Sequence, residues 1–141
     1  MSQIALLSAQ HPEAALLIGI NSRIAVAETT TRYGLDNTNN VADAFRHAYW
    51  NALNASMPIL IGLELAKEFA DAHESGINVN DPAQLLGRTM DFWNNEQGRI
   101  IGNAMINRGN QDIINSVLGA ISNGLMRHIC HGISIPTNQT C

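Results

Sequence analysis

Glycine at regular intervals along one predicted helix is the feature that most constrains how this chain folds. The segment from Pro82 to about Ile106 has apolar residues at helical spacing. A second stripe follows the same segment at intervals of three or four residues: Gly87, Asp91, Asn95, Gly98 and Gly102. Glycine costs a helix interior about 1 kcal/mol relative to alanine. Three glycines on one face therefore predict that another helix or a ligand approaches the backbone there.

Helical spacing of apolar residues and helix-ending residues also predict where helices lie in the rest of the chain. We expect a short helix over residues 2–9 and longer ones from Pro12 to about Thr31 and over 40–54, 58–74, 82–106 and 111–129. The tail, about 130–141, is predicted to be irregular or a short extended piece. Of the 141 residues, 45% are apolar and 14% are charged, which is typical of a globular chain. We predict an all-α fold, a compact single-domain bundle of about five helices spanning 1–141, with a motif-bearing core at about 36–106.

Charge and hydropathy exclude two classes of partner. The net charge is −4 with only eight Lys and Arg residues, which argues against a nucleic-acid partner. No apolar run approaches the roughly 20 residues of a membrane span, so no transmembrane segment is expected. The N-terminus lacks the basic head of a secretory signal. If the protein leaves its producing cell, we expect another route or a larger parent chain.

His47 is the first candidate for chemistry. Asp43 lies one turn before it and Asn51 one turn after it on the predicted helix. A carboxylate in that position can orient an imidazole whose proton affinity is poised near neutral pH. The alternative is a solvent-facing histidine with a partner on the helix surface.

His73 is the second candidate, at the end of the helix predicted over 58–74. It lies within the apolar stripe, between Asp71 and Glu74, immediately before a loop. The group can supply a His–carboxylate acid/base pair or metal ligands. The alternative is a core histidine with satisfied hydrogen bonds. The sequence leaves open whether a metal is used; one divalent ion at most is expected, with His73, Glu74 and Asp91 as its ligands.

A third polar group lies on the glycine-bearing helix. Amide and guanidinium groups of Asn94, Asn95 and Arg99 suit a phosphate, a carboxylate or a developing oxyanion, and Arg46 and Asn51 add similar groups from the preceding segment. The alternative is hydrogen bonding between packed helices. Together the three segments predict the walls of one polar site.

The C-terminal tail contains both cysteines. Cys130 and Cys141 are eleven residues apart and form a disulfide in an oxidising compartment or remain unrelated thiols. His128, Cys130 and His131 make an incomplete zinc set, so a surface tail is favoured there.

Three motifs resemble a family of bacterial domains at the C-termini of wall-associated, RHS-repeat and other polymorphic-toxin-like proteins. Over about 36–103 the chain carries Asp-x-x-Arg-His-x-x-Trp-Asn, an Ala-His-Glu helix end and Met-Asp-x-x-Asn-Asn-x-x-Gly-Arg. The matching positions are Asp43, Arg46, His47, Trp50, Asn51, His73, Glu74, Met90, Asp91, Asn94, Asn95, Gly98 and Arg99. The resemblance implies a secreted or delivered effector that is cytoplasmic in its producer, with a cognate immunity protein among its expected partners.

The residues and the resemblance together favour a hydrolase of an envelope lipid, a lipid-linked precursor or another phosphoester. His47, His73, Asp71, Glu74 and Asp91 are then the catalytic candidates. The substrate-binding candidates are Arg46, Asn51, Asn94, Asn95 and Arg99. Replacing either histidine by alanine is expected to abolish activity and leave the melting temperature nearly unchanged. The alternative is a non-catalytic adaptor or partner-binding module whose polar cluster fixes the helix register.

Overall fold

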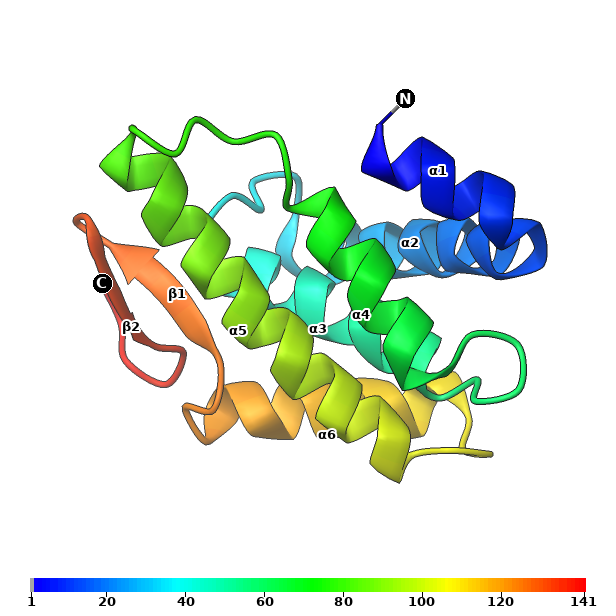
Figure 1. The fold of residues 1–141 in the computed structure, drawn as a ribbon. Coiled ribbons are helices and arrows are strands. Elements are labelled where there is room, and N and C mark those ends of the chain that lie inside the picture. Colours follow the sequence, from blue (N-terminus) through cyan, green and yellow to red (C-terminus); the bar gives the residue numbers. More distant parts are fainter. Residues whose placement is uncertain (1) are drawn as a thin grey trace.

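The computed structural model describes residues 2–141 and contains six helices followed by a two-stranded hairpin (Figure 1). The helices are α1 (Gln3–Gln10), α2 (Pro12–Tyr33), α3 (Val41–Ala55), α4 (Gly62–His73), α5 (Pro82–Ala104) and α6 (Asn110–Ser122). The strands are β1 (Arg127–Cys130) and β2 (Ile133–Pro136), which pair antiparallel. The prediction of a mainly helical chain is confirmed. The helix count is six rather than about five, and the small sheet corrects the all-α class.

Capping side chains begin α3 and α5 close to where the sequence predicted. Asn40 Oδ1 accepts a hydrogen bond from the Asp43 N–H at 3.0 Å, and Asp81 Oδ1 accepts one from the Ala83 N–H at 2.9 Å. Pro82 follows as the first residue of α5. Each cap satisfies an N–H that the first helical turn leaves without a partner.

Two predicted helices are shorter in the structure. Residues 58–61 form a turn, so α4 begins at Gly62, whose φ of 80° suits only glycine well. The last helix ends at Ser122 instead of about 129, because Gly124 has a φ of 74° and turns the chain. His131 and Gly132 then both adopt positive φ, which is the backbone of a tight two-residue hairpin turn.

Helix α3 is the centre of the molecule and contacts α2, α4, α5, α6 and β1. Figure 1 shows α5 crossing in front of it. The two backbones touch at Gly98 and Gly102, where a Cβ atom would collide with the carbonyl oxygens of Ala48 and Ala52 respectively. The predicted close approach is confirmed, and the approaching element is a helix.

Two hydrophobic clusters flank α3. The first joins Phe45 and Tyr49 of α3 to the apolar face of α6, where Val117 is fully buried. The second lies between α1, α2 and α4 and includes Ile18 and Phe69. Trp50 packs against both clusters. Trp50 therefore joins the two clusters across α3.

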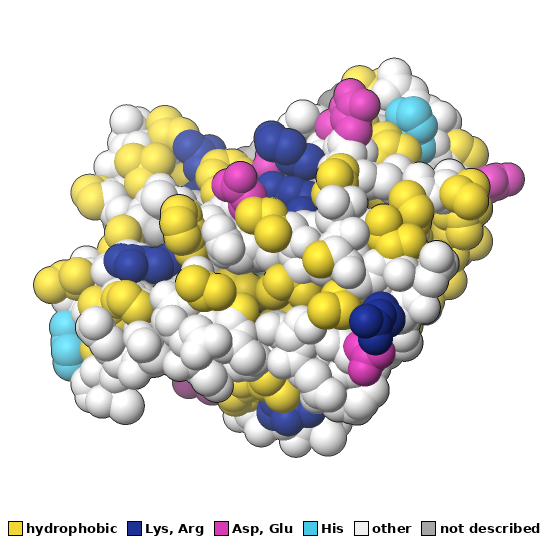
Figure 2. Space-filling model, turned by 90° about the horizontal axis from the view of Figure 1, so that it is seen from below, with side chains coloured by type: hydrophobic (Ala, Val, Ile, Leu, Met, Phe, Trp, Pro, Cys, Tyr) yellow, Lys and Arg dark blue, Asp and Glu magenta, His cyan; other side chains and the backbone are white. Residues whose placement is uncertain are grey.

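The surface seen in Figure 2 carries hydrophobic side chains among uncharged polar ones, with cationic and anionic chains in small separate groups. Charge on this face is thus distributed and not concentrated in one patch. Among the helices of residues 2–141, none combines the length and the apolar character that a membrane crossing needs.

The tail is held by a disulfide between Cys130 and Cys141, with the two Cα atoms 5.5 Å apart. A bond across a loop of this length stabilises a fold by about 2–3 kcal/mol through the entropy of the unfolded chain. We expect Cys141→Ser, or reduction of the wild type, to lower the free energy of urea unfolding by about that amount. Reductant should leave Cys141→Ser itself unaffected. Equal urea midpoints for the oxidised and reduced wild type would contradict this role.

Candidate functional site

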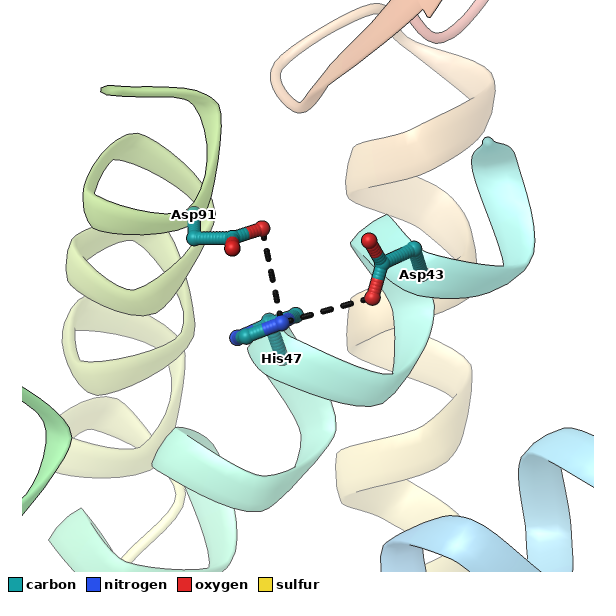
Figure 3. Close-up of side chains that lie close together, drawn as sticks. All are labelled: Asp43, His47 and Asp91. Carbon is teal, nitrogen blue, oxygen red and sulfur yellow. Dashed lines mark ion pairs between the residues drawn. The ribbon is translucent and has the colours of Figure 1, made fainter. Parts of the chain in front are cut away.

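A buried histidine is surrounded by three carboxylates from three helices. His47 Nε2 lies 3.3 Å from Asp43 Oδ1 and 3.4 Å from Asp91 Oδ1, and both carboxylates point toward the ring in Figure 3. On the other side of the ring, Nδ1 lies 3.4 Å from Glu74 Oε1. Only 5% of the His47 side chain is exposed. The structure thus brings residues of all three sequence motifs together at one side chain.

A chain of hydrogen bonds fixes which nitrogen of His47 carries a proton. Arg99 can only donate, and its Nη1 donates to Asn51 Oδ1 at 2.9 Å. The other end of this amide, Asn51 Nδ2, therefore donates to Asn95 Oδ1 at 2.9 Å. That oxygen is thus an acceptor, and His47 Nδ1, also 2.9 Å from it, must be the donor. Nδ1 therefore carries a hydrogen, and Nε2, which faces Asp43 and Asp91, is the nitrogen that gains or loses a proton.

Asp43 receives several donors in addition to the histidine. Its Oδ2 accepts from the Asn39 N–H at 2.7 Å, and its Oδ1 accepts from Arg46 Nη2 at 2.6 Å. Burial raises the pKa of Asp43, but the hydrogen bonds and charges of His47 and Arg46, with the Asn39 N–H, together hold it below its usual value. Asp43 is therefore an anchored carboxylate.

The pKa values of His47 and Asp91 each result from opposing effects of burial and of neighbouring charges. Burial lowers the pKa of His47, but the hydrogen bond to Asp43 and the charges of Asp91, Asp43 and Glu74 outweigh burial and raise it. Burial also raises the pKa of Asp91 to about 8, against the effect of His47 and with the help of Glu74 and Asp43. The raised pKa of Asp91 favours its neutral, protonated form at pH 7, because Asp43 and Glu74 disfavour a further negative charge beside them.

Two carboxylate oxygens in this cluster lack a donor. Glu74 Oε1 and Asp91 Oδ1 are buried and accept no hydrogen bond from the described residues. The Glu74 side chain is only 9% exposed. Buried oxygens without donors are costly in a native structure and point to a missing partner.

A small pocket reaches His47 from the surface between α2, α3 and α4. Its volume is about 50 Å³, enough for a few water molecules. Its lining residues are Ser22, Ala25, Val26, Arg46, His47, Trp50 and His73. Its chemical groups are thus a guanidinium and two imidazoles beside an indole.

His73 lies at the mouth of this pocket. Its ring centroid is 5.4 Å from that of Trp50 and 6.4 Å from that of His47. It is exposed to water and not part of the core, so the alternative of a core histidine with satisfied hydrogen bonds is wrong. Partial burial against its neighbours lowers the pKa of His73; Glu74 opposes this change, while His47 and Arg46 add to it.

An apolar groove adjoins the polar pocket. It has a volume of about 170 Å³ and shares Ser22, Trp50 and His73 with the pocket. The other side chains lining it are mostly apolar: Ile4, Ser8, Ala15, Ile18, Gly19 and Phe69. The two cavities form one amphipathic depression between α1, α2, α3 and α4.

Comparison with known families finds one match. Residues 5–125 match a family described as a domain of unknown function, DUF6973. The chain belongs to the DUF6973 family. Comparison with curated proteins finds no match, and neither does comparison with solved structures.

Several predicted site residues of this DUF6973 domain lie elsewhere. Asp71 pairs with Lys67 on the outer face of α4. Asn94 is buried, and its amide exchanges hydrogen bonds with the backbone N–H and C=O of Arg127, at 2.8 and 2.9 Å, so it anchors β1 to α5. Neither side chain lines the pocket. Sequence spacing placed both residues on the correct helices, but their side chains do not face the pocket.

The amides Asn51 and Asn95 lie within the α3–α5 contact and orient His47 instead of lining the pocket. Arg99 supports them, and burial lowers its pKa. The group of ligand atoms close enough for a metal is Asp43, His47 and Asp91, whereas the expected set was His73, Glu74 and Asp91. The ring centroid of His73 is 6.4 Å from that of His47, and among the described residues His73 does not belong to this group.

Sequence reasoning missed one lining residue of the DUF6973 domain and left the state of its two cysteines open. Ser22 contributes to both cavities from α2, and no motif pointed to it. Cys130 is bonded to Cys141, so its sulfur is not a thiolate ligand for zinc. His128 is buried with Nε2 2.8 Å from the Gln139 carbonyl oxygen, which makes it a structural residue of the hairpin.

Proposed function

We propose that this domain is a hydrolase of a phosphoester in an amphipathic, lipid-like substrate. The observation that carries the proposal is the pocket in which Arg46, His47 and His73 face a common space that continues into an apolar groove. Sites of small-molecule chemistry are concave and largely apolar, with a few convergent polar groups. Perturbed pKa values, as at His47 and His73, often accompany them.

The proposed step needs one base and one cation at the pocket. His73 accepts a proton from a water molecule as the water oxygen bonds to phosphorus. The bond from phosphorus to the leaving alcohol breaks, and the alkoxide takes a proton from solvent at the open mouth. Arg46 holds the anionic phosphoryl oxygens, for which its planar guanidinium is well suited.

The apolar groove supports a substrate that carries an alkyl portion. Ile18 and Phe69 line it, and Trp50 and His73 connect it to the polar pocket. A substrate whose headgroup is bound by Arg46 would place its alkyl chain along this groove. An envelope lipid or a lipid-linked precursor has this combination of groups.

Delivery outside the producing cell is part of the same proposal and is supported by the resemblance to toxin-like proteins. The protein would be cytoplasmic in its producer and act at the envelope of a target cell. A cognate immunity protein would then be its expected partner. Toxicity on expression in bacteria is the corresponding phenotype.

A second candidate function is a non-catalytic module in which the polar network fixes the helix register. The observation that favours it is the buried chain from Arg99 through Asn51 and Asn95 to His47, which joins α3 to α5. Buried polar networks can specify one arrangement of helices, and in this one the only buried side-chain atom without a partner among the described residues is Asn95 Nδ2. This function needs neither His73 nor the pocket.

His73→Ala distinguishes the two functions. We expect it to abolish killing of bacteria that express the domain in the periplasm, because loss of a general base costs about 10²–10⁴-fold in rate. Its melting temperature should match that of the wild type, because His73 is exposed. The measurement is cell survival with profiling of lipids and lipid-linked precursors.

The matched control for this experiment is His131→Asn. His131 is also exposed, and asparagine tolerates its φ of 52°. The control should kill as the wild type does. Full killing by His73→Ala would support the non-catalytic module instead of the hydrolase.

A further inference from the structure

Three potential metal ligands converge beside the pocket. Asp43 Oδ1 and Asp91 Oδ1 lie 3.3 and 3.4 Å from His47 Nε2, and the three atoms lie within 4.8 Å of one another (Figure 3). Ligands held about 2.1 Å from a tetrahedral or octahedral ion are about 3.0–3.4 Å apart. The two distances from Nε2 match one shared ion.

The orientation of His47 suits a ligand role. Its Nδ1–H donates to Asn95 Oδ1 at 2.9 Å, so Nε2 is the nitrogen that faces the two carboxylates and is available to a metal ion. Metal-binding histidines commonly donate their other N–H to an oxygen acceptor in this way.

A second observation points to a cation at this cluster. Glu74 Oε1 is buried beside the same ring, in a side chain only 9% exposed, and it accepts no hydrogen bond from the described residues. Asp91 Oδ1, one of the three ligand atoms, also lacks a donor. The structure therefore leaves two buried carboxyl oxygens without a donor, Asp91 Oδ1 on the Nε2 side of the ring, where the ligands meet, and Glu74 Oε1 on its Nδ1 side.

Arg46 occupies part of that position. Its Nη2 lies 2.6 Å from Asp43 Oδ1 and 3.4 Å from His47 Nε2, two of the same three atoms. The Arg46 side chain is 31% exposed and can turn toward solvent. A guanidinium in this place is a competitor for an incoming ion.

We propose that Asp43, His47 and Asp91 bind one divalent transition-metal ion, and that Arg46 gives way to it. An imidazole with two carboxylates suits Zn²⁺ better than Mg²⁺, which prefers oxygen ligands alone. Three protein ligands leave a coordination position for water or substrate, as in catalytic zinc sites. This site deepens the proposed hydrolase, but ion binding is measured without substrate, so either proposal can fail alone.

The test is calorimetric titration of the full chain with Zn²⁺ and, separately, Mg²⁺ after treatment with a chelator. We expect one Zn²⁺ per chain, much weaker Mg²⁺ binding and a higher melting temperature with Zn²⁺. Asp91→Asn keeps the shape of the side chain and should weaken Zn²⁺ binding at least about tenfold. Asp71→Asn is the matched control, because Asp71 pairs with Lys67 on the outer face, and it should bind as the wild type does.

Arg46→Gln tests the competition. Removing the guanidinium should tighten Zn²⁺ binding, and unchanged or weaker binding would overturn the role given to Arg46. Absence of stoichiometric Zn²⁺ uptake, or equal affinities for wild type and Asp91→Asn, would overturn the site itself. Zinc that bound only at surface histidines would give equal affinities for the wild type and Asp91→Asn. Zinc uptake without any hydrolysis would leave the ion site standing and remove only the proposed reaction.

Discussion

We expect His47→Ala to lower the free energy of unfolding by about 3–5 kcal/mol, the loss typical when one partner of a buried ion pair is removed. The substitution leaves Asp43, Asp91 and Glu74 without the imidazole that lies against all three. It also removes the donor to Asn95 Oδ1. Urea unfolding at pH 7 in the presence of a chelator measures this effect without bound metal.

A double variant separates charge from packing in this loss. Asp91→Asn keeps the side-chain volume and removes one of the carboxylates next to His47. We therefore expect His47→Ala combined with Asp91→Asn to be more stable than His47→Ala alone. Strictly additive losses would show that the cavity, and not unbalanced charge, accounts for the effect. From the sequence alone, His47→Ala was expected to leave the melting temperature nearly unchanged. The burial of His47 in the structure is why a large loss of stability is expected instead.

Gly98→Ala should destabilise the fold by about 3 kcal/mol or more, at the upper end of overpacking effects. A Cβ at position 98 would collide with the backbone of Ala48, including its carbonyl oxygen. Backbone atoms in two packed helices cannot move aside as a flexible side chain can. α3 and α5 must therefore separate, and this would also disturb the bonds between Asn51 and Asn95. Thermal and urea unfolding measure the loss.

Gly119→Ala is the matched control for this prediction. Gly119 lies inside α6, and a Cβ there meets nothing within 4 Å. Alanine is favoured over glycine in a helix by about 1 kcal/mol, so this variant should be as stable as the wild type or more so. A Gly98→Ala protein with wild-type stability would show that α3 and α5 can separate without cost.

The sequence predicted the helical segments and the close backbone contact because both depend on local periodicity. The glycine stripe of α5 predicted that another helix or a ligand approaches its backbone, and the structure shows that this element is α3. The predicted helix boundaries were wrong where the backbone conformation of a glycine determines the boundary. Gly124 ends the last helical region and allows β1 and β2 to pair. A segment of four residues carries too short a pattern to distinguish strand from helix.

The sequence by itself determined which residues could share a site. Its three polar motifs lie on predicted helices, and the glycine stripe on one of these helices predicted that another element packs closely against it. It did not determine which side of each helix faces inward. Tertiary packing turned Asp43, His47 and Asp91 toward one point and left Asp71 partly exposed and paired with Lys67. It also placed His73 at the pocket mouth rather than in the core. The physical reason is that burial, tautomer and charge balance depend on atoms from several helices, and no spacing along one helix encodes them.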